Sequence, residues 1–192
     1  MKRKLLGILL LGFASGLPYM LVFSTLTAWL RDVGISLTEI GFFAWLVLTY
    51  SLKFLWAPFV DRYSIPGFVV FGKRRGWILF SQLIIFLSLI GMSFIDPLTN
   101  IQLLALFAFF AAFFGSIQDV AVDALRIEIG DAKEQGDLAA SYQLGYRVAI
   151  LVATSMALIF ADLYNWSYVY QFMGFLMLLG SAGALICYEP TN

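Results

Sequence analysis

Apolar residues gather into six runs along the chain, and short polar connections separate the runs. Each run is close to the length of about 20 residues that an α-helix needs to cross a membrane. The runs do not alternate apolar and polar positions, as barrel strands would, and helices satisfy their backbone hydrogen bonds internally. The sequence therefore predicts an all-α, polytopic membrane bundle over residues 1–192 with no soluble domain, and with spans of about 5–30, 39–59, 76–95, 101–125, 138–161 and 167–188.

Polar residues between the runs have the spacing of helix boundaries. Ser36 and Glu39 form the pattern of a capping box, which predicts that the second helix begins there. Pro97 is expected to end the third helix, and Asn100 can cap the fourth. Asn165 stands just before the sixth run, among tyrosines that are typical of a membrane interface. The boundaries predicted from caps thus agree with those predicted from hydropathy.

Composition also indicates a membrane protein. Apolar residues make up 61% of the chain and charged residues 12%, against about half and about a quarter in average globular proteins. This balance excludes a disordered chain, a nucleic-acid-binding protein and a secreted domain held by disulfides. The net charge is zero, so the bulk charge indicates no acidic or basic partner.

Two residue types are scarce, and their scarcity excludes several kinds of chemistry. Cys187 is the single cysteine, so no disulfide can form within the chain. The chain has no histidine, which excludes histidine metal sites, Ser–His triads and histidine proton relays. No metal or other cofactor is expected.

Basic residues fall on alternate connections. Arg31 is the one basic residue in the connections that follow the first, third and fifth spans. The N-terminus and the connections that follow the second and fourth spans carry Lys2, Arg3, Lys4, Arg62, Lys73, Arg74, Arg75, Arg126 and Lys133. Because basic connections tend to stay in the cytoplasm, both termini are predicted to be cytoplasmic. Lys2–Lys4 followed by leucines could also begin a signal peptide. The apolar stretch continues to Leu30, however, which favours a retained first helix.

The fourth span carries ionisable residues that lipid would disfavour. At 100° per residue, Gln118, Asp119, Asp123 and Arg126 share one arc of about 140°. A charged group at mid-membrane costs about 2.5–3.5 kcal/mol, so such residues usually face a bundle interior or a watery cavity. Lipid headgroups would explain Arg126 and Asp123, but Asp119 lies roughly two turns inside. Asp119 and Asp123 are therefore the candidate proton carriers.

The fifth span has a polar arc of its own. Gln143, Tyr146 and Arg147 lie within roughly 100° of one another. Arg147 is near the middle of the span, where it could form a structural ion pair or bind a substrate anion. Asp119 and Arg147 lie at depths that differ by roughly 5 Å, which an arginine side chain can span. We therefore predict an intramembrane ion pair between Asp119 and Arg147.

The first and second spans carry weaker signals. Gly12 and Gly16 form a small-xxx-small face, which is typical of close helix packing. Pro18 should loosen the backbone just beyond that face, and a bent helix that lines a cavity with Tyr19 is the alternative. Lys53 lies near the end of the second span, where its charged group can reach the membrane surface.

The connection between the second and third spans contains Asp61–Arg62 and then Gly72–Arg75. It resembles the signature of the major facilitator superfamily: a glycine and Asp-Arg, followed by a glycine and two basic residues. Ala57 stands where the first glycine is expected, and about nine residues separate the two parts. This spaced form is similar to that of the AmpG-type muropeptide permeases and their acetyl-coenzyme A transporter relatives.

Three further segments are similar to that group. Gly12–Pro18 resembles its first-helix motif, and Leu55–Asp61 resembles its second-helix segment. Gln118–Arg126 is the most specific match. AmpG-type permeases have two halves of six helices, so the resemblance implies that this chain is the first half of a transporter in the bacterial inner membrane. It also implies proton-coupled import of anhydromuropeptides, which are glycan-peptides from peptidoglycan turnover.

The resemblance assigns roles to the polar residues. In the family plan the first, fourth and fifth helices line the substrate cavity, which here gives Gly16, Tyr19, Gln118, Asp119, Gln143, Tyr146 and Arg147. The basic connection becomes a cytoplasmic gate, in which Asp61 and Arg126 would touch, formed by Asp61, Arg62, Lys73, Arg74, Arg75 and Arg126. The expected partners are membrane lipid, a glycan-peptide substrate and a second six-helix half, with no nucleic acid.

Other functions compete with this interpretation. A facilitator-type transporter could carry an acyl-coenzyme A or a drug, but an anionic coenzyme would require several cavity cations, and Arg147 alone is clearly deep. A membrane scaffold subunit would use Asp119 and Arg147 for folding alone. Asp119 and Asp123 have the i, i+4 spacing of a carboxylate pair, but no flanking glycine motif supports intramembrane catalysis, so the chain is not expected to be an enzyme.

Overall fold

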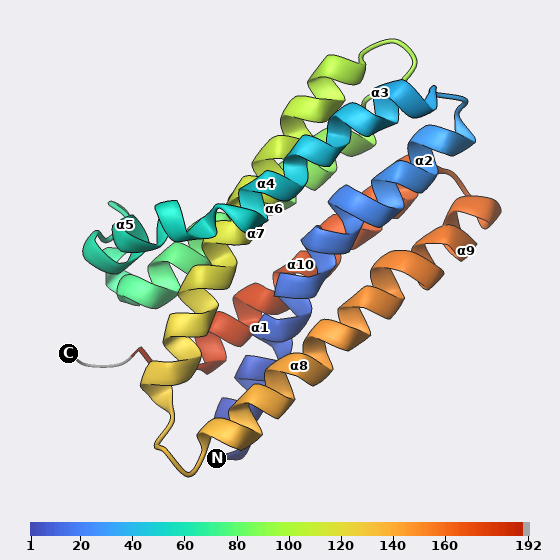
Figure 1. Cartoon of the computed structure of the whole chain (residues 1–192). Coiled ribbons are helices and arrows are strands. Elements are labelled where there is room, and N and C mark those ends of the chain that lie inside the picture. Colours follow the sequence, from blue (N-terminus) through green and yellow to red (C-terminus); the bar gives the residue numbers. More distant parts are fainter. Residues whose placement is uncertain (190–192) are drawn as a thin grey trace.

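The structure is a computed structural model, and it describes residues 1–189 as helices joined by short connections, with no strand among them (Figure 1). Six helices are long and apolar enough to cross a membrane. The predicted fold class, an all-α polytopic bundle, is therefore confirmed. We number these membrane-length helices 1–6: Lys2–Asp32, Leu37–Leu55, Lys73–Ser93, Ile101–Ile129, Gln135–Leu163 and Trp166–Ile186.

Three of the six are single α-helices, and three consist of segments. Helices 3, 4 and 6 are α6 (Lys73–Ser93), α7 (Ile101–Ile129) and α10 (Trp166–Ile186). Helices 1 and 5 each contain a π-helical turn. Helix 1 consists of α1 (Lys2–Met20), the π-helical turn Leu21–Thr25 and α2 (Leu26–Asp32). Helix 5 consists of α8 (Gln135–Leu151), the π-helical turn Val152–Met156 and α9 (Ala157–Leu163). Helix 2 alternates α and 3₁₀ turns: α3 (Leu37–Phe42), Phe43–Leu46, α4 (Val47–Ser51) and Lys53–Leu55. The short helix α5 (Ala57–Arg62) follows it.

The helix caps form at boundaries that the sequence predicted. Ser36 and Glu39 make both hydrogen bonds of the capping box at the start of α3. The side chain of Asn100 accepts from the backbone N–H of Leu103 at 3.2 Å, and Asn165 accepts from Tyr168 at 3.0 Å. Each cap satisfies a donor at a helix start that would otherwise lack a partner.

The sequence predicted that the second helix continues to about residue 59. Pro58 explains why it does not continue that far as one helix. Proline has no N–H for the carbonyl of the residue four positions earlier, here Phe54, and its ring clashes with that carbonyl. The chain turns at Trp56, and α5 begins anew with Pro58 in its first turn. Helix 2 therefore reaches the end of the bundle as a bent, segmented element.

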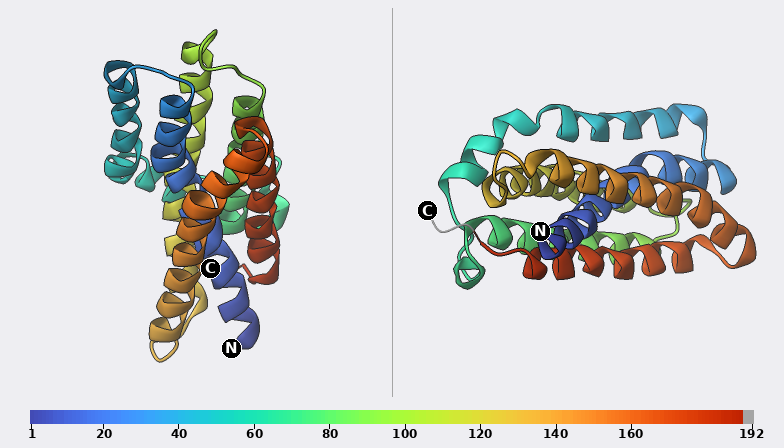
Figure 2. Two further views of the ribbon diagram at one scale, coloured as in Figure 1. Left: turned by 90° about the vertical axis from the view of Figure 1, so that its right-hand side faces the viewer. Right: turned by 90° about the horizontal axis from the view of Figure 1, so that it is seen from below.

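The bundle has three layers, which the right-hand view of Figure 2 shows. Helix 2 forms one side, α6 and α10 form the other, and α1, α7 and α8 lie between them. The N-terminus and the end of α10 lie together, since Arg3 Nε donates to the carbonyl of Ile186 at 3.0 Å. We call this the N-terminal end of the bundle, and the other end, with connections 33–36, 94–100 and 164–165, the distal end.

Helix 1 meets helix 5 backbone to backbone through glycines. A side chain added at Gly12 would collide with the carbonyl of Tyr142, and one added at Gly145 would collide with the carbonyl of Leu9. Gly16 is likewise packed against the carbonyl of Tyr146. Small residues allow this close approach. Gly16 is therefore buried in a helix contact, and its predicted cavity role stays a prediction.

The two π-helical turns lie beside one another in the bundle. Leu21–Thr25 of helix 1 and Val152–Met156 of helix 5 are in contact, and the hydroxyl of Thr25 donates to the carbonyl of Ala153. Such turns widen a helix locally and are frequent at functional sites. The sequence predicted loosening beyond Pro18, and the first π-helical turn begins three residues after it, whereas nothing in the sequence predicted the second.

The substitution Thr25→Val should destabilise the bundle, because the buried carbonyl of Ala153 loses this donor. Hydrogen bonds between membrane helices contribute about 0.6–2 kcal/mol, so we expect the free energy of unfolding to fall by roughly 1 kcal/mol. Thermal unfolding of the purified chain in detergent measures the change. Thr27→Val is the matched control, since the exposed hydroxyl of Thr27 binds within its own helix, to the carbonyl of Phe23. Equal losses for both variants would contradict a bond between the π-helical turns.

Candidate functional site

Asp119 of α7 lies inside the bundle, next to helix 1. Its side chain is 9% exposed, and its Oδ1 atom is buried without a hydrogen-bond partner. Ser15 of α1 lies beside it, and the Ser15 hydroxyl is also buried without a partner. Since buried polar groups are normally paired, this pair of unsatisfied groups marks a candidate site.

Several tyrosines lie near Asp119. Tyr50 of α4 and the α8 residues Tyr142 and Tyr146 are all within electrostatic range of its carboxylate. Tyr19 of α1 packs edge to face on Tyr50, with ring centroids 5.0 Å apart. We call the set the Asp119 cluster: Ser15, Tyr19, Tyr50, Asp119, Tyr142 and Tyr146. Helices 1, 2, 4 and 5 therefore all contribute to it.

The sequence identified part of this cluster and missed the rest. Tyr19, Asp119 and Tyr146 were predicted to lie at the site. Tyr50 and Tyr142 were not, although Tyr50 is a lone phenol in an apolar stretch. Tyr142 stands one turn before Tyr146 on the same face of helix 5, which was the available signal for it. The hydroxyl of Tyr50 is buried without a hydrogen-bond partner, so its side chain adds a third unsatisfied group.

Gln118 lies between α7 and helix 1, and its predicted cavity role stays a prediction. Pro18 has no N–H, so the carbonyl of Ala14 lacks its α-helical donor. Nε2 of Gln118 donates to that carbonyl at 3.0 Å, and the Gln118 side chain is fully buried. Gln118 therefore replaces the donor that Pro18 removes, and it joins α7 to helix 1.

The predicted ion pair between Asp119 and Arg147 is wrong: among residues 1–189, no ion pair joins them. The reason is the glycine contact with helix 1, which fixes the rotation of α8. Arg147 stands two residues after Gly145, about 200° round the helix, and its side chain is exposed. Gln143 is exposed on the same side of α8.

At the N-terminal end, Arg74 joins three segments. Its Nη1 atom lies 2.6 Å from Asp61 of α5, and its Nη2 atom lies 2.6 Å from Glu128 of α7. The predicted contact between Asp61 and Arg126 is wrong, because Arg74 at the start of α6 lies between α5 and the end of α7. Arg126 is instead 3.7 Å from Asp123, one turn earlier in α7.

The other residues of the predicted gate lie around this ion-pair network. Lys73 and Arg75 are half-buried on either side of Arg74. Arg62 is exposed, with its guanidinium 5.9 Å from the centroid of the Tyr63 ring. The sequence did not identify Glu189, whose carboxylate accepts from the backbone N–H groups of Arg74 at 2.7 Å and Arg75 at 3.1 Å. Anions are stabilised at a helix start in this way.

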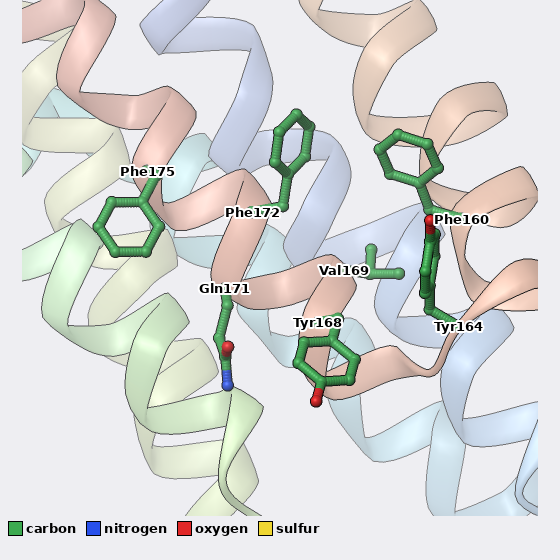
Figure 3. A pocket seen from close by; sticks show the side chains of 7 residues that line it. All are labelled: Phe160, Tyr164, Tyr168, Val169, Gln171, Phe172 and Phe175. Carbon is green, nitrogen blue, oxygen red and sulfur yellow. The ribbon is translucent and has the colours of Figure 1, made fainter.

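A groove of about 550 Å³ lies near the distal end, between α9 and α10. Figure 3 shows Phe160 and Tyr164 on one side, and Phe172 and Phe175 on the other. Its walls are mostly aromatic and it contains no charged side chain. None of the Asp119 cluster lines it, so the groove offers a surface for apolar groups and no acid-base chemistry.

Residues 8–192 match the family described as the Major Facilitator Superfamily. The chain belongs to this superfamily. The predicted resemblance is thereby confirmed, and six apolar helices in this superfamily make the chain a multi-pass membrane protein.

Within the superfamily, the chain is similar to several curated proteins. The chain is 39% identical to the "Anhydromuropeptide permease" of Escherichia coli strain K12 over 186 residues, which are 96% of the chain and 37% of the permease. It is 36% identical over 191 residues to a Rickettsia typhi protein whose name includes AmpG 3, covering 98% of the chain and 46% of that protein. The chain thus spans less than half the length of the curated relatives it matches.

The substitution Gln118→Leu should destabilise the bundle by about 1–3 kcal/mol, since it leaves the buried carbonyl of Ala14 without a donor. Pro18→Ala restores an N–H at residue 18, which can bind that carbonyl within helix 1. We therefore expect the double variant to recover most of the lost stability. Thermal unfolding of the four proteins in detergent tests the interaction. If the losses of stability of the two single variants simply add in the double variant, Gln118 does not replace the N–H that Pro18 lacks.

Glu134 gives a pH-dependent test at the N-terminal end. Lys4 Nζ donates to its Oε2 at 2.7 Å, and this hydrogen bond lowers the pKa of Glu134 from its usual 4.5. A carboxyl group with a lowered pKa stabilises the fold above its ordinary pKa, and this contribution is lost as the pH falls through the folded-state pKa. Glu134→Gln should therefore lower the melting temperature at neutral pH.

The difference in melting temperature between Glu134→Gln and the wild type should shrink as the pH falls below 4.5. Melting curves across the acid range measure it. Asp162→Asn serves as the control, because Asp162 is an exposed carboxylate near the distal end. A difference that stays constant with pH would mean that the ion pair does not contribute to stability.

Proposed function

We propose that the chain is the N-terminal half of a secondary active transporter that imports anhydromuropeptides into the cytoplasm, coupled to protons. The observation that carries this proposal is the Asp119 cluster, a buried carboxyl group with unsatisfied neighbours at the meeting point of four helices. The name of the Escherichia coli relative supports the substrate. The basic residues of the N-terminal end support a position in the bacterial inner membrane with both termini cytoplasmic.

Exposed polar residues support a second half as partner. Arg147 and Gln143 are exposed near the middle of helix 5, where contact of Arg147 with lipid would be costly. Helices 2 and 5 are also the least buried, at 22% or less of their most apolar stretches, against 67% in helix 1. A second six-helix bundle against these helices would cover Arg147 and enclose a cavity. Membrane lipid would then contact the outer helices α6 and α10.

Asp119 is suited to carry a proton. As a carboxylic acid it gains an O–H donor, and the Ser15 hydroxyl beside it has no other partner. As a carboxylate it accepts hydrogen bonds from the same hydroxyl. Asp123 is half-buried and near Arg126, so it is the second candidate. Because Arg147 does not hold Asp119 in an ion pair, the Asp119 carboxyl group can exchange its proton without breaking one.

The polar side chains on helices 1 and 5 suit a glycan-peptide. Tyr19, Tyr142, Tyr146 and Gln143 offer neutral donors and acceptors, which match sugar hydroxyls and peptide amides. Arg147 offers a cation for a peptide carboxylate. An acyl-coenzyme A would require a denser set of cations around its phosphates. We further propose that the Arg74 network, with Asp61 and Glu128, holds the cytoplasmic gate closed in this conformation.

A chimera tests the function. The chain replaces the matching part of the Escherichia coli permease, and the chimera is expressed in cells that lack their own permease. Labelled anhydromuropeptide should accumulate in these cells, and a proton uncoupler should abolish accumulation. Asp119→Asn should lower the accumulation of substrate at least about tenfold. Transport of substrate down its own concentration gradient should continue.

Asp162→Asn is the control, and it should transport as the unmodified chimera does. Membrane insertion is checked for each protein by surface labelling. An inserted chimera that transports an acyl-coenzyme A or a drug, and no muropeptide, would overturn the substrate. Full accumulation by the Asp119→Asn variant would overturn its role as proton carrier.

A further inference from the structure

Helix 2 contacts α7 at two points on either side of Lys53. The hydroxyl of Tyr50 packs against Gly115, where an added side chain would collide with it. Nε1 of Trp56 donates to the hydroxyl of Ser116 at 3.1 Å. The segment between these two points is therefore held against α7.

Lys53 stands on the face of helix 2 that turns towards α7. It comes three residues after Tyr50 and three before Trp56, within the 3₁₀ turn Lys53–Leu55. Residues three apart lie on one face of a helix in both α and 3₁₀ geometry. The side chain of Lys53 therefore points to the same side as Tyr50 and Trp56, and it is half-buried.

Lys53 also lies within about one α-helical turn of the level of Asp119. Helix 2 and α7 run in the same direction, from the distal end to the N-terminal end (Figure 1). Tyr50 contacts Gly115 and Trp56 contacts Ser116, so Lys53 lies opposite this part of α7. Asp119 follows Ser116 by three residues, about 4.5 Å along the helix, which a lysine side chain can span.

The other groups around Asp119 do not supply a positive charge. Ser15, Tyr50, Tyr142 and Tyr146 are neutral side chains, and Asp123 is a second acid in the same helix. Of the charged groups that act on Asp119 in the described part of the chain, Lys53 attracts and Asp123 repels its carboxylate. Lys53 forms no direct ion pair within residues 1–189, so its attraction acts through space.

We infer that Lys53 is the counter-charge of Asp119, a positioning residue that stabilises the deprotonated carboxylate when the proton leaves. This inference rests on the proposed function, since it gives the proton carrier its cationic partner. It replaces both earlier assignments, in which Arg147 neutralised Asp119 and Lys53 reached the membrane surface. Because Lys53 lies in the turn before Pro58, where helix 2 is broken, any shift of helix 2 changes the distance between the two charges.

Infrared spectroscopy of the purified chain in lipid nanodiscs tests the inference. The C=O band of the protonated Asp119 side chain is identified by its loss in Asp119→Asn. Wild type and variants are compared at the pH where half of this band is present in the wild type. In Lys53→Met the band should rise from half towards its full intensity, because the carboxylate loses its nearby cation.

Two variants separate charge from structure. Lys53→Arg keeps the positive charge, so the band should stay near half of its full intensity. Lys133→Met removes an exposed lysine from the loop before α8 and should also leave the band near half. Lys53→Gln is used in place of Lys53→Met if the methionine variant does not fold, and the expected rise is the same.

The outcomes distinguish this inference from the proposed function. An Asp119 band that titrates in the wild type and is unchanged in Lys53→Met or Lys53→Gln would overturn the role of Lys53 and leave the proton carrier in place. A band that rises equally in Lys53→Arg would also overturn it, since the charge would then not be the cause. No titrating band for Asp119 in the wild type would overturn the proton carrier itself.

Discussion

The backbone contact between helix 1 and helix 5 fixes the rotation and depth of the groups that matter most in this bundle. Gly12, Gly16 and Gly145 remove the side chains that would separate the two helices. With α8 held at that rotation, Tyr142 and Tyr146 turn towards Asp119, and Arg147 turns outwards. The contact also brings the two π-helical turns together, so that Thr25 reaches the carbonyl of Ala153. One packing interaction thus determines both what the acid site contains and which face of helix 5 remains free.

Properties that depend on a single helix could be predicted from the sequence. The six spans, the caps at Ser36, Asn100 and Asn165, and the polar arc of helix 4 all follow from the order of residues along one element. The angle of Asp119 on its own helix was sufficient to mark it as unusual. The same reasoning identified the small-residue face of Gly12 and Gly16, because the spacing of small residues on one helix can be recognised without knowing which helix packs on it.

Properties that depend on which helices are neighbours could not be predicted. Depth alone made Arg147 a suitable partner for Asp119, but helical angles do not say that α8 packs on helix 1 by its glycine face. Asp61 likewise has several basic residues within reach along the sequence, and the fold selects Arg74. Gln118 was the most instructive difference. Its polar side chain suggested water, whereas its partner is a carbonyl that Pro18 leaves free, a relation visible only once α7 and helix 1 lie side by side.

The start of α6 is a mechanical junction of the molecule. The side chain of Arg74 is bound to α5 and to the end of α7, while its backbone N–H is bound to Glu189, after the last helix. Four segments of the chain therefore meet at one residue. A pull on the chain beyond helix 6 would be transmitted through Glu189 to α6 and on to α5, without passing through the apolar interior. The segment that follows the break in helix 2 is thereby tied to the residue that follows the last helix.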